Sequence, residues 1–80
     1  MQKAIHSPDQ IRLRDLLKTS RIEAGLTQQQ LARRLSVPQS FVSKYESGER
    51  RLDLIELRSI CKALGMSLQV FVKRFDESAK

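Results

Sequence analysis

The stretch LTQQQLARRLSVPQSFVSKYESG, residues 26–48, decides the fold of this chain. Its first half carries apolar side chains at helical spacing, which predicts a helix over about 28–35. Proline disfavours helical geometry in the residue before it, so Pro38 predicts a tight turn just ahead of it. A second helix is expected over about 38–47, with Gly48 ending it. The stretch therefore predicts two short helices joined by a tight turn.

Three further helices are expected around this stretch. Ser7 and Pro8 begin a helix that runs to residue 24, because serine is a favoured N-cap and proline a favoured first residue. Asp53 and Ser67 are the expected N-caps of two later helices. The first of these carries an apolar stripe of Leu54, Leu57, Ile60, Cys61 and Leu64. No alternating run indicates a strand, so the chain is expected to be all-α, with five helices.

Size and composition indicate one small domain over residues 1–80, with its core between about residues 8 and 75. Hydrophobic residues make up 40% of the chain and charged residues 30%, which supports a small core under a polar surface. Lys and Arg number 15 against 9 Asp and Glu, giving a net charge of +6. This balance favours a polyanionic partner, nucleic acid before an anionic membrane surface. A merely basic protein without such a partner is the alternative.

Several classes of function find no support in the sequence. A single cysteine, Cys61, cannot form an internal disulfide, so a cytoplasmic location is expected, with the thiol packed in the core. No apolar run approaches the roughly 20 residues of a membrane span, and the N-terminus lacks the apolar core of a signal peptide. The sequence contains no nucleophile–base pair and no phosphate-binding glycine loop. We therefore expect neither an enzyme nor a cofactor. His6 has no partner ligands, so no metal site is assigned.

The helix over 38–47 is expected to present a polar outer face. With Val42 directed toward the core, a rotation of 100° per residue places Pro38, Tyr45 and Glu46 on the inner side. The outer and flanking side chains are Gln39, Ser40, Phe41, Ser43, Lys44 and Ser47. Glutamine can bond adenine, lysine can reach guanine or a phosphate, and an aromatic ring can pack on a thymine methyl group. An ordinary solvated helix face is the alternative.

These residues carry a resemblance to a known family. Gln-x-x-Leu-Ala, a short turn and Val-Ser-Lys-Tyr-Glu-Ser-Gly closely resemble the helix-turn-helix of the Cro/repressor type, also called the XRE family. TQQQLARRLSVPQSFVSKYESGERR is similar to the family's second helix, recognition helix and following loop, and SICKALGMSLQVF to its last two helices. The resemblance implies a five-helix, lambda-repressor-like DNA-binding domain with the helix-turn-helix at its second and third helices.

The resemblance also implies roles for individual residues. It places four residues at base-contacting positions: Gln39, Ser40, Ser43 and Lys44. It assigns phosphate contacts to Gln28, Arg50 and Arg51, whereas the outer face of the helix over 38–47 adds Phe41 and Ser47 as DNA contacts of less defined kind. Arg21 and Glu46 match a structural ion pair of the family, which would give a partner to an arginine otherwise placed on an apolar stripe with Leu13, Leu17 and Ala24. The family usually has Ser or Thr where Pro38 stands, so the recognition helix lacks the usual side-chain cap.

Together these features predict a sequence-specific, DNA-binding transcriptional regulator, bacterial or phage-encoded, cytoplasmic and nucleoid-associated. We expect a repressor that binds a palindromic operator as a homodimer, with the excess apolar residues of the last helix as the contact: Phe71, Val72 and Phe75. An antitoxin that binds a toxin and represses its own operon is an alternative, as is a restriction-modification controller protein. A protein-interaction module without DNA binding is less favoured, because the outer face of the helix over 38–47 is almost free of carboxylates.

Overall fold

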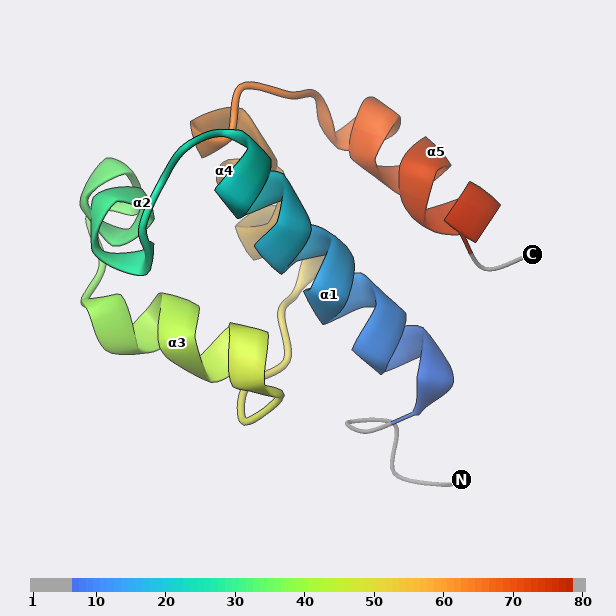
Figure 1. The fold of residues 1–80 in the computed structure, drawn as a ribbon, viewed down its shortest axis with the longest axis horizontal. Helices are drawn as coiled ribbons and strands as arrows, with labels where there is room; N and C mark the ends of the chain where they lie inside the picture. Colours follow the sequence, from blue (N-terminus) through green and yellow to red (C-terminus); the bar gives the residue numbers. More distant parts are fainter. Residues whose placement is uncertain (1–6, 79–80) are drawn as a thin grey trace.

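The structure, a computed structural model, describes residues 7–78 and contains five helices in that range (Figure 1). They are α1 (Pro8–Glu23), α2 (Gln28–Leu35), α3 (Gln39–Ser47), α4 (Leu54–Ala63) and α5 (Leu68–Ser78). The described residues contain no strand, which confirms the predicted all-α fold. The prediction about His6 lies outside the described residues.

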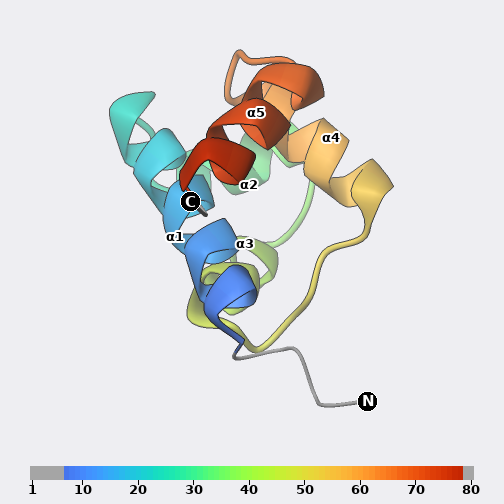
Figure 2. The same ribbon diagram turned by 90° about the vertical axis from the view of Figure 1, so that its right-hand side faces the viewer.

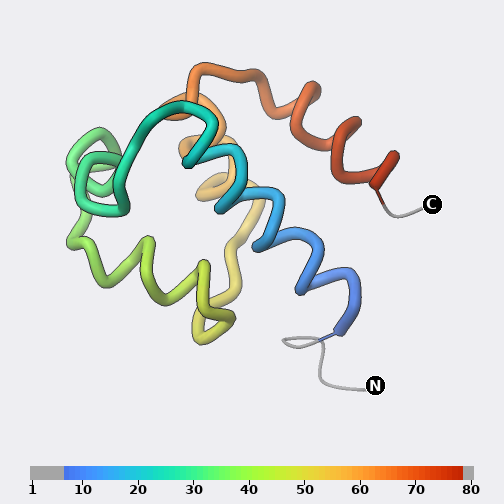
Figure 3. Tube along the Cα trace, in the orientation of Figure 1, coloured from blue at the N-terminus to red at the C-terminus, as the bar shows by residue number. Residues whose placement is uncertain are grey.

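The helices are arranged so that α3 lies at the edge of the molecule. Figure 1 shows α1 crossing the middle, with α2 and α3 on one side and α5 on the other. α3 packs against α1 and α2, α2 also packs against α4, and α5 covers α4 and α1. Figure 2 shows α4 and α5 together in the upper part of the molecule, with the loop that follows α3 rising from below to the start of α4. The trace in Figure 3 turns sharply between α2 and α3, which leaves one side of α3 without a neighbouring helix.

Each of the five helices contributes to one core. Its buried members are Leu17, Leu31, Ala32, Val42, Tyr45, Ile60, Cys61, Leu64 and Phe71. Complete burial of a large apolar side chain stabilises a fold by about 1.5–3 kcal/mol, so the few large members matter most. Burial also raises the pKa of the Cys61 thiol, which keeps it protonated and packed as a core residue.

The helix ends follow the capping signals of the sequence. The Ser7 hydroxyl accepts a hydrogen bond from the Gln10 amide at 3.1 Å. Both α2 and α4 begin with a complete capping box, in which the N-cap side chain and the side chain three residues later bond each other's backbone N–H groups. α3 differs because its N-cap is Pro38, in extended geometry and without a side-chain hydrogen bond. The helix therefore starts at residue 39, one residue later than predicted.

Two backbone positions with positive φ set the direction of α3. Ser36 ends α2 at φ 58°, in the left-handed region, and so turns the chain toward α3. Gly48 ends α3 at φ 91°, where a side chain would be strained. A Cβ added at Gly48 would also lie only 2.3 Å from Nη1 of Arg14, because that guanidinium covers the glycine. The C-terminal end of α3 is thereby packed directly against α1.

Three residues predicted to face inward are exposed. Ala24 is the C-cap of α1 and lies beyond its last buried turn. Leu54 is the first residue of α4, at a point where the helix has not yet reached the core. Pro38 lies outside the helical geometry of α3, so the rotation of 100° per residue does not apply to it. The inward stripes of these helices are therefore shorter than their sequence patterns.

Candidate nucleic-acid interface

The outer side of α3 carries a row of exposed polar side chains. Val42 and Tyr45 are buried and so fix which side of the helix faces α1 and α2. The exposed residues on the other side are Gln39, Ser40, Lys44 and Ser47, with Ser43 and Phe41 half-buried beside them. The helix thus presents the six side chains that the sequence analysis singled out.

A buried ion pair holds α3 to α1. The Nε and Nη2 atoms of Arg21 donate to the two carboxylate oxygens of Glu46, at 2.8 and 3.1 Å. The two side chains are only 10% and 4% exposed. Nη1 of Arg21 donates to the carbonyl oxygen of Leu26 at 2.8 Å, which also ties in the loop before α2. The hydrogen bonds to Glu46 raise the pKa of Arg21, so the arginine stays charged and paired.

A second set of hydrogen bonds carries this ion pair to the surface. Nε2 of Gln28 donates to Oε1 of Glu46 at 2.9 Å, and Nε2 of Gln39 donates to Oε1 of Gln28 at 3.3 Å. A continuous chain therefore runs from the buried Arg21 to an exposed side chain at the start of α3. The sequence analysis did not predict this series of hydrogen bonds. The only signal for it was a glutamine at the start of each of two helices joined by a tight turn.

The loop after α3 places Arg50 against the side of that helix. The Cζ atom of Arg50 lies 4.6 Å from the centroid of the Phe41 ring. The same ring packs edge-to-face on Tyr45, with centroids 5.7 Å apart and an interplanar angle of 72°. Nη2 of Arg50 lies 2.6 Å from Oε2 of Glu56 at the start of α4. Sequence reasoning identified Arg50 and Phe41 as separate candidates and missed both their contact and Glu56.

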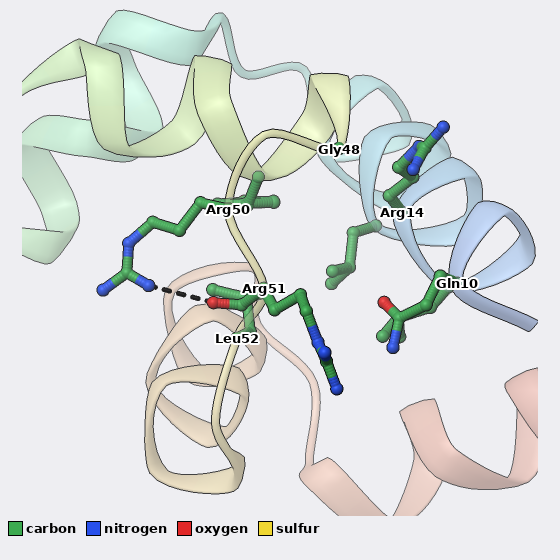
Figure 4. Close-up of a pocket in the computed structure, with 9 residues that line it drawn as sticks. Gln10, Arg14, Gly48, Arg50, Arg51 and Leu52 are labelled. Atoms are coloured by element: carbon green, nitrogen blue, oxygen red, sulfur yellow. Dashed lines mark hydrogen bonds between the residues drawn. The ribbon is translucent and has the colours of Figure 1, made fainter. Parts of the chain in front are cut away.

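The remaining candidates lie apart from this contact. Arg51 is exposed, and Figure 4 shows its side chain directed toward Gln10 of α1, away from Arg50. The Ser47 hydroxyl donates to the Lys44 carbonyl oxygen at 3.1 Å and lies 3.2 Å from a carboxylate oxygen of Glu49. Glu49 thus brings one carboxylate to the end of an otherwise neutral or basic surface.

The hollows beside α3 differ greatly in size. One of about 330 Å³ is lined by Phe41, Arg50, Ile55 and Glu56 among others. The pocket in Figure 4, lined by Gln10, Arg14, Gly48, Arg51 and Leu52 among others, has a volume of about 10 Å³, room for about one water molecule. Within residues 7–78, no group of His, Cys, Asp and Glu side chains could hold a metal ion. None of the helices described is long and apolar enough to cross a membrane.

A family model described as helix-turn-helix matches residues 17–71. The chain is also 42% identical to an XRE-family like protein from Pseudomonas syringae pv. tomato str. DC3000, with 96% of this chain and 94% of that chain covered and a TM-score of 0.86. This chain belongs to the XRE family of helix-turn-helix proteins. The XRE-family resemblance and the lambda-repressor-like fold are both confirmed, and the protein is a helix-turn-helix regulator.

Other solved structures are also similar to this XRE-family protein. The wild-type restriction-modification controller protein C.Esp1396I is 28% identical, with a TM-score of 0.82, and the match covers 90% of this chain and 95% of that chain. The same controller, as a tetramer in complex with its natural 35 base-pair operator, matches with the same values. No curated protein matches the chain. The helix-turn-helix family model, which matches residues 17–71, includes α2 and α3 in full.

Glu46→Ala is expected to lower the free energy of unfolding by about 3–5 kcal/mol, because it leaves the buried guanidinium of Arg21 without its carboxylate. Urea unfolding followed by circular dichroism measures the loss. Glu23→Ala is the matched control, since Glu23 pairs with Arg74 at the surface, 3.5 Å away, and should cost at most about 1 kcal/mol. Similar losses from the two variants would contradict an anchoring role for the buried pair.

Proposed function

We propose that this protein is a transcriptional repressor that binds a palindromic DNA operator as a homodimer, with α3 in the major groove. The observation that carries the proposal is the polar outer row of α3, held in a fixed orientation by the ion pair between Arg21 and Glu46. A rigid helix with small polar side chains outward can lie close to base edges. The net charge of +6 favours the approach to phosphates.

Base contacts are proposed for the exposed row and its flank: Gln39, Ser40, Ser43 and Lys44. The hydrogen bond from Gln39 to Gln28 directs that amide, and both groups remain near the surface at the start of α3. Gln28 uses one N–H on Glu46, so its second N–H is available for a phosphate beside the start of α2, where the helix dipole also favours an anion. Phosphate contacts then position the helix, while the base contacts read the sequence.

Four further residues have less direct proposed roles. Arg50 and Arg51 would bind phosphates next to the groove, from the loop that follows α3. Phe41 supports Arg50 through its ring, and its half-buried position leaves it a smaller part in base contact than the sequence suggested. Ser47 is bonded to the backbone of α3 and to Glu49, so it would contact DNA only at the edge of the interface.

The homodimer contact is proposed on α5, with one change from the sequence prediction. Phe71 is 1% exposed and belongs to the core, so its part in the predicted contact was wrong. Val70 and Val72 are 51% and 46% exposed, and Phe75 is half-buried beside the core. The solved tetramer of the similar controller protein on its operator supports assembly of such domains on DNA. Two copies joined through α5 would each present one α3 to the DNA.

A restriction-modification controller is the second candidate function. It is favoured by the similarity to C.Esp1396I, 95% of whose chain is covered. Genes for a DNA methyltransferase and a restriction endonuclease beside this gene would select this candidate. A toxin gene in the same place would instead select the antitoxin alternative, which stays a hypothesis.

Selection of bound duplexes from random DNA tests the proposed function. The expected product is a palindrome whose half-sites are about one helical turn, ~34 Å, apart, because two α3 helices of a dimer enter successive major grooves. Its affinity should fall steeply with salt as phosphate contacts release counterions. Recovery of no common site, together with an affinity for DNA that does not change with salt, would contradict the proposal.

Val72→Glu is expected to convert the homodimer into a monomer, because it places a charge in the apolar contact of α5. Light scattering measures the mass, and operator affinity should fall by roughly 100-fold when the two half-sites no longer bind together. Ile55→Glu is the matched control, an exposed apolar residue of α4 whose replacement should leave the dimer intact. A Val72→Glu protein that remains a dimer would place the contact elsewhere.

A further inference from the structure

Glu56, in the first turn of α4, binds two groups with one carboxylate. Its Oε1 accepts the backbone N–H of Asp53 at 3.0 Å, which completes the capping box of α4. Its Oε2 accepts Nη2 of Arg50 at 2.6 Å, and Nη1 of Arg50 lies 3.4 Å from Oε1. The carboxylate that starts α4 thus also holds the arginine proposed to bind a phosphate.

The guanidinium of Arg50 is restrained from three directions. Glu56 accepts a hydrogen bond from Nη2 of Arg50, and the Phe41 ring lies against the face of the guanidinium. Nη1 of Arg50 donates to the carbonyl oxygen of Arg51 at 3.0 Å. The side chain is still 41% exposed. Since a guanidinium carries five N–H donors in one plane, the donors not used here can meet an anion only from a limited direction. Arg50 therefore has a fixed position, and a neighbouring negative charge offsets its own.

Arg51 provides the contrast within the same loop. It is exposed, and none of the ion pairs found among residues 7–78 involves it. Figure 4 shows the two side chains leaving the loop in different directions, Arg51 toward α1 and Arg50 away from it. An unrestrained arginine can move to a phosphate of any DNA that comes near, whereas Arg50 cannot do so without leaving Glu56 and Phe41.

This difference matters because phosphates carry no sequence information. A mobile cation strengthens binding to every DNA, including the large excess of wrong sites. A fixed cation favours a phosphate in one place, and the carboxylate beside it repels a phosphate in other places. Repulsion of the wrong arrangement is a recognised way to gain specificity.

We propose that Glu56 is a specificity-determining residue, which restrains Arg50 so that it binds a phosphate only when α3 is correctly seated on its operator. The proposal rests on the DNA-binding function proposed above. Glu56 acts through Arg50 and makes no contact with the bases. Its effect is to lower the affinity for unrelated DNA more than the affinity for the operator.

Glu56→Gln tests the proposal without removing the start of α4. Glutamine can fill the same place in a capping box, as Gln30 does in α2, so the change removes the charge and keeps the cap. The probes are the duplex recovered by the selection and a random-sequence duplex of equal length, at one salt concentration. The ratio of the two affinities is expected to fall by roughly threefold to fivefold, the scale of one exposed ion pair, because the random duplex gains most.

Two controls separate this effect from a general change in charge. Glu49 lies in the same loop, but its carboxylate meets the Ser47 hydroxyl and not an arginine, so Glu49→Gln should strengthen both affinities equally. Glu56→Gln in an Arg50→Ala background should leave the ratio unchanged. An equal gain on both duplexes from Glu56→Gln, or the same fall in ratio without Arg50, would overturn the proposal. If the selection recovers no operator, the proposed DNA-binding function itself is contradicted. That result is obtained with the unmodified protein and does not depend on Glu56.

Discussion

The structure depends on one buried interaction, the ion pair between Arg21 and Glu46. Two charges removed from water are costly unless each hydrogen-bonding group finds a partner. Here the guanidinium meets both carboxylate oxygens and the carbonyl oxygen of Leu26, so the pair joins α1, α3 and the loop before α2. An apolar contact could also join these elements, but it would fix their rotation less strictly, because dispersion contacts have little directionality.

Hydrogen bonds connect the buried ion pair to side chains at the surface. Gln28 bonds Glu46, and Gln39 bonds Gln28, so the first exposed side chain of α3 takes its position from the buried pair. In the first turn of α3, the Phe41 ring contacts the guanidinium of Arg50, which also pairs with Glu56. Side chains with fixed positions thus lie around the first turn of α3, and Ser40, Ser43 and Lys44 are the part free to adapt to DNA.

Local rules were enough to predict the helices, but the contacts between them were not. The caps at Ser7 and Asp53 and the break before Pro38 depend on neighbours in the chain, so they could be predicted. The bond between Gln28 and Gln39, and the pairing of Arg50 with Glu56, depend on how α2, α3 and α4 meet and on which rotamers that meeting allows. Which of Phe71, Val72 and Phe75 is buried was not predicted for the same reason, since apolar spacing alone does not say which of several side chains is covered. The roles of individual residues on DNA stay predictions.

The most direct test of the central claim is the operator affinity of the double variant Arg21→Met, Glu46→Leu. Replacement of a buried ion pair by apolar side chains of similar size is often neutral or stabilising, so this variant should fold, as circular dichroism can verify. If the pair orients α3 through Gln28 and Gln39, the folded variant should bind the operator at least roughly tenfold more weakly, the scale of losing one base contact, with little change on random DNA. A folded variant with unchanged operator affinity would contradict the claim.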